Sequence, residues 1–381
     1  MVAIRPPLVF WFETPPKISK GAFNYVSRAW GNRVLYICRR DVSADRKAIK
    51  WNDGDFGNAE VIMLSDFPNV EEHIKETFES HRNSIHIVNG FDNPLVQLLK
   101  KHIKSSRYKV VFHSEKPTVT FLGLKGLCQR TWIPLKYRAI YFEYRKVAKA
   151  LITFGMYGKR VFESFGWEAE RVFNYMYCPP EKAIRQNSPA AVSNEVKFLY
   201  VGRFNFRTRA LDVLMEAIDS LTGSFHFTLV GGYGENSNEV IDWATSREKV
   251  AFAGKWPSDE VGIRMSGYDV YVAPTRADGW NVQVNDALRA GLGVITTTEA
   301  VSDELITASG AGIVVPANDA RALAKALQCA VDNPDKVYRW KEKALVYAPR
   351  ISSEAVGNYF VEILDYLFIT PDRNRPACPW L

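Results

Sequence analysis

Cysteine is scarce in this chain, and its few cysteines are not spaced like metal ligands or a disulfide framework. Only five occur among 381 residues. They are odd in number, widely scattered and without C-x-x-C spacing. This pattern is typical of reduced thiols in a cytoplasm, and it offers no zinc site. The sequence therefore predicts a cytoplasmic protein without a cysteine-bound metal.

Long apolar runs are missing as well. No window approaches the roughly 18–20 apolar residues of a membrane-spanning helix. The N-terminus has only Arg5 ahead of a short apolar run that ends in an acid and two prolines, which is too short for the core of a signal segment. No repeat recurs at a fixed period. These absences leave a globular protein as the expectation.

What the chain does contain is an alternation of short β-rich runs with helical patterns, the signature of parallel sheets covered on both faces. Its length exceeds the roughly 250–300 residues at which a single core stops growing, so two domains are expected. In the first half, strands are predicted at Leu8–Glu13, Val34–Arg39, Glu60–Ser65, Ser84–Gly90, Tyr108–Ser114, Ala150–Gly155 and Arg171–Tyr177. Helices are predicted between them, as at Gly21–Trp30, Asn69–Arg82 and Asn93–Ser106.

A polar, proline-containing stretch, Cys178–Glu195, interrupts this alternation and is interpreted as the interdomain linker. It predicts an N-terminal Rossmann-like domain at 1–180 and a second at 196–350. Residues 351–381 would form a helix and tail that cross back to the first domain.

The most informative segment is Thr275–Ile295, which carries Asp278 and Asp286 around the start of a predicted helix. Both acids would lie at the carboxyl edge of a parallel sheet, where open α/β folds bind ligands. Amides of Gly279, Trp280 and Asn281 would lie at the helix N-terminus, whose partial positive charge favours phosphate. Acids for sugar hydroxyls beside amides for a diphosphate indicate a nucleotide-sugar site. The alternative is a loop acid that caps the helix, followed by an exposed helix acid.

This segment resembles the E-x7-E region of family 4 glycosyltransferases, with Asp in place of each Glu. Upstream, KFLYVGRFNFRTRALDVLMEAI resembles the family's strand, Gly-Arg turn and helix, with Gly202 and Arg203 matching. The family's Lys-Gly stands here as Arg209-Ala210, one residue further from Arg203. The resemblance covers roughly residues 196–330. It implies an α/β GT-B fold, with two Rossmann-like domains facing a central cleft, and a retaining enzyme.

Three further positions carry weaker signals. His113 ends an apolar strand where family members place a histidine beside the transferred sugar; the alternative is a histidine with a structural role. Gly231 and Gly232 follow another strand and either let backbone approach the donor or form a tight turn. Gly21 lies between the first strand and first helix, where the family often has a glycine-rich loop that faces the diphosphate.

The mechanism implied by the resemblance needs no cofactor beyond the nucleotide sugar. Arg203 and Arg209 would stabilise the departing diphosphate, and Asp278 and Asp286 would hold hydroxyls of the sugar and of the ribose. Front-side displacement, with help from the leaving phosphate, is the inferred route. A metal-binding D-x-D string occurs at 53–55, but its polar, glycine-rich setting reads as a turn, so no metal is expected.

Positive charge is concentrated in one region. Between Lys100 and Lys182 there are 17 Lys and Arg against 6 acids, a surplus of +11 in a chain whose net charge is +7. Thr131–Leu151 is predicted to be a helix with a basic, aromatic surface that suits anionic lipid headgroups. The protein is therefore expected to lie peripherally on the inner face of the membrane. The alternative is an ordinary solvated face. The membrane or acceptor residues would be Trp132, Lys136, Arg138, Phe142, Arg145, Lys146 and Lys149.

The sequence therefore predicts transfer of a sugar to a glycan, expected to be lipid-linked. A nucleotide-sugar 2-epimerase of the same architecture and a non-catalytic nucleotide-sugar-binding protein are alternatives. A nucleic-acid binder would explain the basic charge, but no zinc, helix-turn-helix or RNA-binding motif is present, so no nucleic-acid partner is expected.

Overall fold

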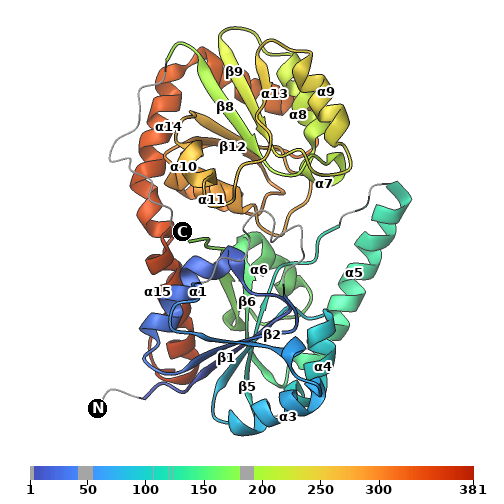
Figure 1. Ribbon diagram of the computed structural model, residues 1–381, viewed down its shortest axis with the longest axis vertical. Coiled ribbons are helices and arrows are strands. Elements are labelled where there is room, and N and C mark those ends of the chain that lie inside the picture. The colour runs from blue at the N-terminus through green and yellow to red at the C-terminus, as the bar shows by residue number, and fades with distance from the viewer. Residues whose placement is uncertain (1–3, 42–54, 106, 120, 122, 181–192) are drawn as a thin grey trace. The chain divides into compact units, whose positions relative to one another are not determined.

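The computed structural model describes residues 4–41, 55–105, 107–119, 121, 123–180 and 193–381. Two compact units divide the chain, and Figure 1 shows their elements. Unit 1 comprises residues 1–117, 130–180 and 352–379; unit 2 comprises residues 118–129, 181–351 and 380–381. Among the described helices, none combines the length and the apolar character needed to cross a membrane.

Unit 1 is built on a seven-stranded parallel sheet of order β3-β2-β1-β4-β5-β6-β7. Its strands are β1 (Leu8–Phe12), β2 (Val34–Cys38), β3 (Glu60–Met63), β4 (Ile85–Asn89), β5 (Lys109–Ser114), β6 (Ala148–Phe154) and β7 (Val172–Tyr175). All seven predicted strands are confirmed, with shifts of up to two residues at their ends. They were recognisable because parallel strands are buried on both faces, so β1 reads as the unbroken apolar run LVFWF.

Helices cover both faces of this sheet. They are α1 (Lys20–Ala29), α3 (Val70–Ser80), α4 (Pro94–Ile103), α5 (Gly123–Tyr144, continuing from unit 2), α6 (Gly155–Ser164) and α15 (Ser353–Phe368), with short 3₁₀ turns at Lys17–Ser19, Leu64–Asp66 and Ala169–Arg171. Side-chain caps fix several starts: Asn69 accepts from the amide of Glu72, and Asn93 from that of Val96.

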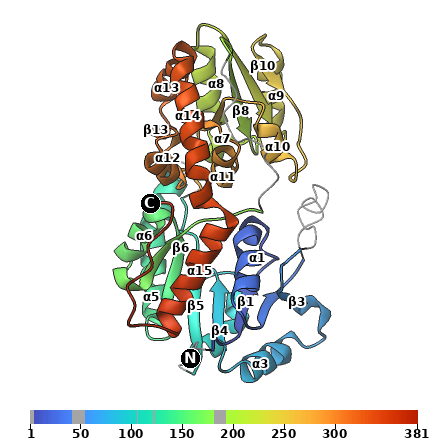
Figure 2. The ribbon, with the colours of Figure 1, turned by 90° about the vertical axis from the view of Figure 1, so that its left-hand side faces the viewer.

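The helix α15 lies against α1 on one face of the unit 1 sheet (Figure 2). Glycines make this close approach possible. A Cβ on Gly21 would lie 2.4 Å from Oγ of Ser353, and one on Gly357 would lie 2.8 Å from the carbonyl of Ala22. Below these helices, rings of Phe10, Phe23 and Phe360 pack together.

One predicted element of unit 1 is wrong at its end. The helix expected at Thr131–Leu151 is α5, which begins eight residues earlier and ends at Tyr144. The residues Ala148–Leu151 belong to strand β6 instead. The apolar run that continues into Ile152, Thr153 and Phe154 pairs with β5 and β7, and this pairing overrides the helical spacing.

Unit 2 repeats the same strand order in a six-stranded parallel sheet, β10-β9-β8-β11-β12-β13. The strands are β8 (Val196–Val201), β9 (Phe225–Val230), β10 (Val250–Phe252), β11 (Val270–Ala273), β12 (Gly293–Thr297) and β13 (Gly312–Val315). The helices are α7 (Phe206–Arg209), α8 (Leu211–Asp219), α9 (Ser237–Thr245), α10 (Val261–Met265), α11 (Val282–Arg289), α12 (Asp303–Ser309), α13 (Ala320–Asp332) and α14 (Pro334–Tyr347), followed by a 3₁₀ turn at Ala348–Ile351.

Each unit is therefore a Rossmann-like sheet whose strand order reverses at one place. In unit 2 the reversal lies between β8 and β11, which are hydrogen-bonded neighbours. The loops that leave the carboxyl ends of these two strands separate in opposite directions, which opens the ligand position of doubly wound folds.

Candidate active site

The loops after β8 and β11 bring Arg209 and Asp278 together at this reversal point. A guanidinium N–H of Arg209, at the end of α7, donates to a carboxylate oxygen of Asp278. The two side chains are 21% and 13% exposed, so the pair is largely shielded from water. Burial lowers the pKa of Arg209, but Asp278 and the hydroxyls of Tyr200 and Tyr271 raise it above its ordinary value overall. The arginine is therefore a fixed cation.

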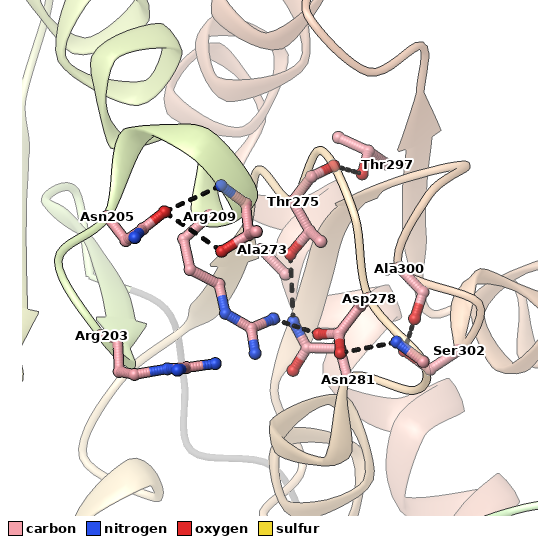
Figure 3. Close-up of polar contacts among 12 residues, drawn as sticks. Arg203, Asn205, Arg209, Ala273, Thr275, Asp278, Asn281, Thr297, Ala300 and Ser302 are labelled. Carbon is pink, nitrogen blue, oxygen red and sulfur yellow. Dashed lines mark hydrogen bonds and ion pairs between the residues drawn. The ribbon is translucent and has the colours of Figure 1, made fainter. Parts of the chain in front are cut away.

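Arg203 projects toward this pair from the turn after β8 (Figure 3). Its side chain is exposed, while its carbonyl accepts a 2.8 Å hydrogen bond from the Tyr200 hydroxyl. The preceding Gly202 leaves room for that hydroxyl, because a Cβ there would lie 2.7 Å from it. Two arginine heads thus reach one region, and this is the arrangement in which cations bind a diphosphate.

The turn that carries Arg209 is fixed by local bonds. Asn205 caps α7 by accepting from the amide of Thr208 at 2.8 Å and from its hydroxyl at 3.1 Å. Ala210 then adopts the left-handed conformation, with φ 53° and ψ 40°, before α8 begins. The glycine that the resembling family has at this position is suited to that conformation, whereas an alanine is strained there.

The loop between β11 and α11 is held by its own polar groups. Asp278 accepts from the amide of Gly279 at 2.9 Å, and the amide of Asn281 donates to the carbonyl of Ala300 at 3.1 Å. Trp280 is buried, and its indole N–H donates to Asn285 at 2.9 Å. Two of the three amides predicted to bind phosphate therefore have protein acceptors here.

Asp286 lies on α11, four residues into the helix, and is buried. The sequence placed it within the first turns of a helix that follows the β11 loop, and α11 has that position. Its proposed contact with ribose stays a prediction.

Gly231 and Gly232 follow β9 in a loop packed against the Gly202 turn. A Cβ on Gly231 would lie 2.0 Å from the carbonyl of Gly202, and one on Gly232 would lie 2.8 Å from the ring of Phe252. Both residues have positive φ values. This packing gives both glycines a structural reason, and their proposed approach to the donor stays a prediction.

His113 and Gly21 lie in the interior of unit 1. His113 is 1% exposed and in contact with the rings of Phe23, Phe154 and Phe360. Burial lowers its pKa to about 3, so the ring is neutral. Gly21 is the second residue of α1, within the helix predicted at Gly21–Trp30, and its proposed approach to the diphosphate stays a prediction.

The amide nitrogen of Asn89 lies 3.2 Å from Nδ1 of His113. Asn89 in turn lines a cavity of about 180 Å³ at the carboxyl ends of β1 and β4, the reversal point of the unit 1 sheet. Glu13, Lys17 and Tyr177 also line this cavity. Sequence reasoning missed it because its residues come from three separated segments.

Sequence reasoning also missed Arg276, which lies within the informative segment. Its guanidinium bonds both carboxylate oxygens of Asp212 at 2.6 Å, and also bonds Phe206 and Asn318. The sequence signal that could have identified Arg276 is its place as a charged residue between the apolar strand that ends at Ala273 and the glycine at Gly279. The string at 53–55 lies partly outside the described residues, and the described ones contain no group of three or more His, Cys, Asp or Glu arranged to hold a metal.

The fold is that of GT-B glycosyltransferases. HepE of Anabaena, solved with UDP and glucose, superimposes with a TM-score of 0.69 over 94% of this chain and 99% of its own, at 13% identity. WaaG, a glycosyltransferase involved in lipopolysaccharide biosynthesis, gives 0.64 over 95% and 100%, at 15% identity. At such identities these likenesses define the fold, two parallel-sheet Rossmann-like units, and confirm that prediction.

More particularly, residues 195–333, which lie within unit 2, match the family model described as "Glycosyl transferases group 1". Putative colanic acid biosynthesis glycosyltransferases named WcaL, from Salmonella typhimurium and Escherichia coli, are 26% and 29% identical over 40% of this chain and 43% of theirs. The match thus spans less than half the length of these relatives. The resemblance to family 4 glycosyltransferases is confirmed.

Proposed function

We propose that this protein transfers a hexosyl group from a nucleoside-diphosphate sugar to a glycan, with retention of anomeric configuration. The observation that carries the proposal is the meeting of Arg203, Arg209 and Asp278 at the reversal point of the unit 2 sheet. The group 1 match over the same residues supports it, and so does the UDP bound by HepE.

Transfer of the glycosyl group requires stabilisation of the negative charge that develops on the leaving diphosphate. Fixed cations beside that position perform this role without reorganisation during the reaction. Arg209 is suited to it because Asp278 already orients its guanidinium. On donor binding, the diphosphate would accept some of the hydrogen bonds that the Arg209 guanidinium donates. The carboxylate of Asp278 would then accept hydrogen bonds from the sugar hydroxyls. Asp286 would bind the ribose.

No divalent metal is required on this proposal, because the arginine pair supplies the positive charge that a metal would otherwise contribute. The reaction would follow front-side displacement, in which the leaving phosphate oxygen takes the acceptor proton.

The acceptor would be a lipid-linked glycan that contacts unit 1. The cavity lined by Glu13, Asn89 and Tyr177 offers carboxylate, amide and phenol groups for sugar hydroxyls. The WcaL relatives are named for colanic acid biosynthesis, which supports a polysaccharide product. The protein would lie peripherally on the cytoplasmic face of an anionic membrane, through the basic residues on and after α5: Lys136, Arg138, Arg145, Lys146 and Lys149, with Trp132 and Phe142.

The test is incubation with a panel of nucleotide sugars, scored for release of nucleoside diphosphate, with NMR assignment of the product anomer. Release with one donor class, lost in Arg209→Ala, supports the proposal. Release of free nucleoside diphosphate together with an epimerised sugar would instead identify a 2-epimerase. Donor binding without turnover under any acceptor would identify a binding protein.

A further inference from the structure

Cys329 on α13 and Lys336 on α14 place a thiol and an amine in contact. Lys336 Nζ lies 3.2 Å from Sγ of Cys329. Both residues belong to unit 2 and are partly exposed, and their two helices follow each other in the chain and pack together (Figure 2). The thiol is therefore reachable from solvent, and a second nucleophile lies directly beside it.

The turn between the two helices holds this pair in place. The amide of Asn333 donates to the carbonyl of Ala330 at 3.3 Å, and its side-chain nitrogen donates to the carbonyl of Cys329 at 2.9 Å. Pro334 then starts α14 with the backbone geometry that a first helical turn requires. The amide of Lys336 donates to the carbonyl of Asn333 at 2.9 Å. These bonds fix both backbones, so a closer approach of nitrogen to sulfur needs side-chain movement alone.

The Lys336 ammonium is not held by a carboxylate. It lies 5.6 Å from the centre of the Trp340 ring, and within the described part of the chain no acid forms an ion pair with it. By contrast, Lys341 on the same helix is paired with Asp269 at 2.8 Å. Because no ion pair has to break first, the nitrogen of Lys336 can react with the neighbouring sulfur.

We propose that Cys329 and Lys336 form a cross-link site that closes when the protein meets hydrogen peroxide. The peroxide oxidises the thiol to a sulfenic acid, S–OH, and is itself reduced to water. The uncharged Lys336 amine then attacks the sulfur. An S–N bond forms, and the hydroxyl of the sulfenic acid leaves as water with one proton from the amine. The product is a sulfenamide that retains one N–H.

A thiol reductant reverses this bond in two steps. The first thiol attacks the sulfur, releases the Lys336 amine and leaves a mixed disulfide on Cys329. A second thiol releases the Cys329 thiol and leaves as the disulfide of the reductant. The cross-link is therefore a reversible response to the oxidation state around the protein.

The cross-link would fasten α14 to α13. The helix α14 also packs against β12 and α11, and its Lys341 pairs with Asp269, which directly precedes β11. A covalent ring over residues 329–336 restricts the unfolded chain, so the cross-linked form of unit 2 resists unfolding more than the reduced form. This inference is independent of the proposed function, since neither side chain belongs to the candidate active site.

The experiment treats the whole chain with hydrogen peroxide and maps its tryptic peptides by mass spectrometry without reductant. Trypsin cuts after Lys and Arg, so the reduced chain yields peptide 326–336. A cross-linked Lys336 resists cleavage, and the expected product is peptide 326–339. It should be lighter by about 2 Da than the unmodified peptide of the same span, because two hydrogen atoms are lost. Dithiothreitol should restore peptide 326–336.

Three variants assign the reacting atoms. Cys329→Ser lacks the sulfur and should yield only peptide 326–336. Lys336→Arg keeps the positive charge but has no amine, so oxidation should stop at the sulfenic acid, which dimedone traps. The matched control is Lys325→Arg, which changes an exposed lysine one turn before Cys329 and should cross-link as the native protein does. Circular dichroism would verify that all three variants are folded.

Thermal unfolding gives a second readout. Peroxide should raise the Tm of the native protein and of Lys325→Arg, and it should leave that of Lys336→Arg without this upward shift. Oxidised Cys329 in a peptide that still ends at Lys336 would overturn the proposal. So would a lighter peptide that persists in Lys336→Arg. None of these readouts requires sugar transfer, so this proposal and the proposed function can fail separately.

Discussion

Arg276 and Asp212 form a two-pronged ion pair, with both nitrogen–oxygen distances at 2.6 Å. Arg276 lies on the loop after β11, and Asp212 lies on α8. Backbone bonds reinforce the pair, since the amides of Arg276 and Ala277 donate to the carbonyl of Thr208 at 2.9 and 3.2 Å. Together these contacts fix the loop that carries Asp278 against the turn that carries Arg209.

Arg276→Ala should therefore weaken diphosphate binding although Arg276 is not proposed to touch the ligand. We expect about a tenfold loss of UDP affinity by calorimetry, equivalent to about 1.4 kcal/mol. Arg276→Lys should recover little, because an ammonium cannot form the paired geometry. The control is Arg264→Ala, whose ion pair with Glu260 is about half exposed and should contribute little. An unchanged affinity in Arg276→Ala would show that the loop needs no such support.

Replacing Asp278 by Asn separates binding from turnover. The change keeps the side-chain shape but removes the negative charge that occupies Arg209. UDP affinity should therefore hold or rise, while kcat/KM should fall roughly 10- to 100-fold, as expected for losing a charged hydrogen bond of about 1.5–3 kcal/mol. Calorimetry and steady-state kinetics check the two halves. Weaker UDP binding in Asp278→Asn would contradict the competition between carboxylate and phosphate.

Ala210→Gly should stabilise the protein. A non-glycine residue in the left-handed region costs roughly 1–2 kcal/mol. Glycine removes this strain, but part of the gain in stability is offset because glycine has greater conformational freedom in the unfolded chain. A net gain of about 0.5–1 kcal/mol in urea unfolding is expected. Ala217→Gly, in the interior of the neighbouring helix α8, should destabilise by about 1 kcal/mol. If both changes destabilise equally, the strain at Ala210 is absent in solution.

Acid should destabilise the fold through His113. Its folded pKa is lowered to about 3 by burial, so between roughly pH 6.5 and 3 only the unfolded chain binds the proton. Stability is thus fully present above pH 6.5 and is lost as the pH falls, by about 2 kcal/mol for this group between pH 7 and 5. Urea unfolding at the two pH values should show a smaller loss in His113→Phe. Equal losses in both proteins would mean that His113 is protonated when folded.

Turnover should continue when divalent metal is removed. On the proposed function, Arg203 and Arg209 would supply the charge that the leaving group needs, so EDTA should leave initial rates within about twofold of the untreated protein, a change below 0.5 kcal/mol in the barrier. Rates that EDTA abolishes and magnesium or manganese restores would show that a metal stabilises the leaving diphosphate.

Strands and the general position of the site were predictable because both depend on local patterns. Buried parallel strands are unbroken apolar runs, and β8 and β11 end directly before Gly202 and Pro274. The end of α5 was not predictable in the same way, since residues 147–154 have apolar spacing compatible with a helix or a strand. Pairing with β5 and β7 decided the outcome.

The ion pair of Arg209 with Asp278 could not be predicted from the sequence. The two residues are 69 positions apart, and their contact depends on Asn205, Ala210 and Arg276, whose roles are set by tertiary packing. His113 illustrates the converse. Its position at a strand end suggested a place beside the transferred sugar, but the α15 helix, more than 240 residues later in the chain, places Phe360 against the ring.

The two units have separate hydrophobic cores, one around β8 and β9 and the other around β1 and β5. Because a core substitution acts mainly on its own immediate neighbours, each unit can diversify without repacking the other. On the proposed function, the donor is recognised by unit 2 and the acceptor by unit 1. Natural selection can then exchange acceptors through the loops of one unit while the donor chemistry of the other is inherited unchanged, and chimaeras joined near the linker should inherit donor preference with unit 2.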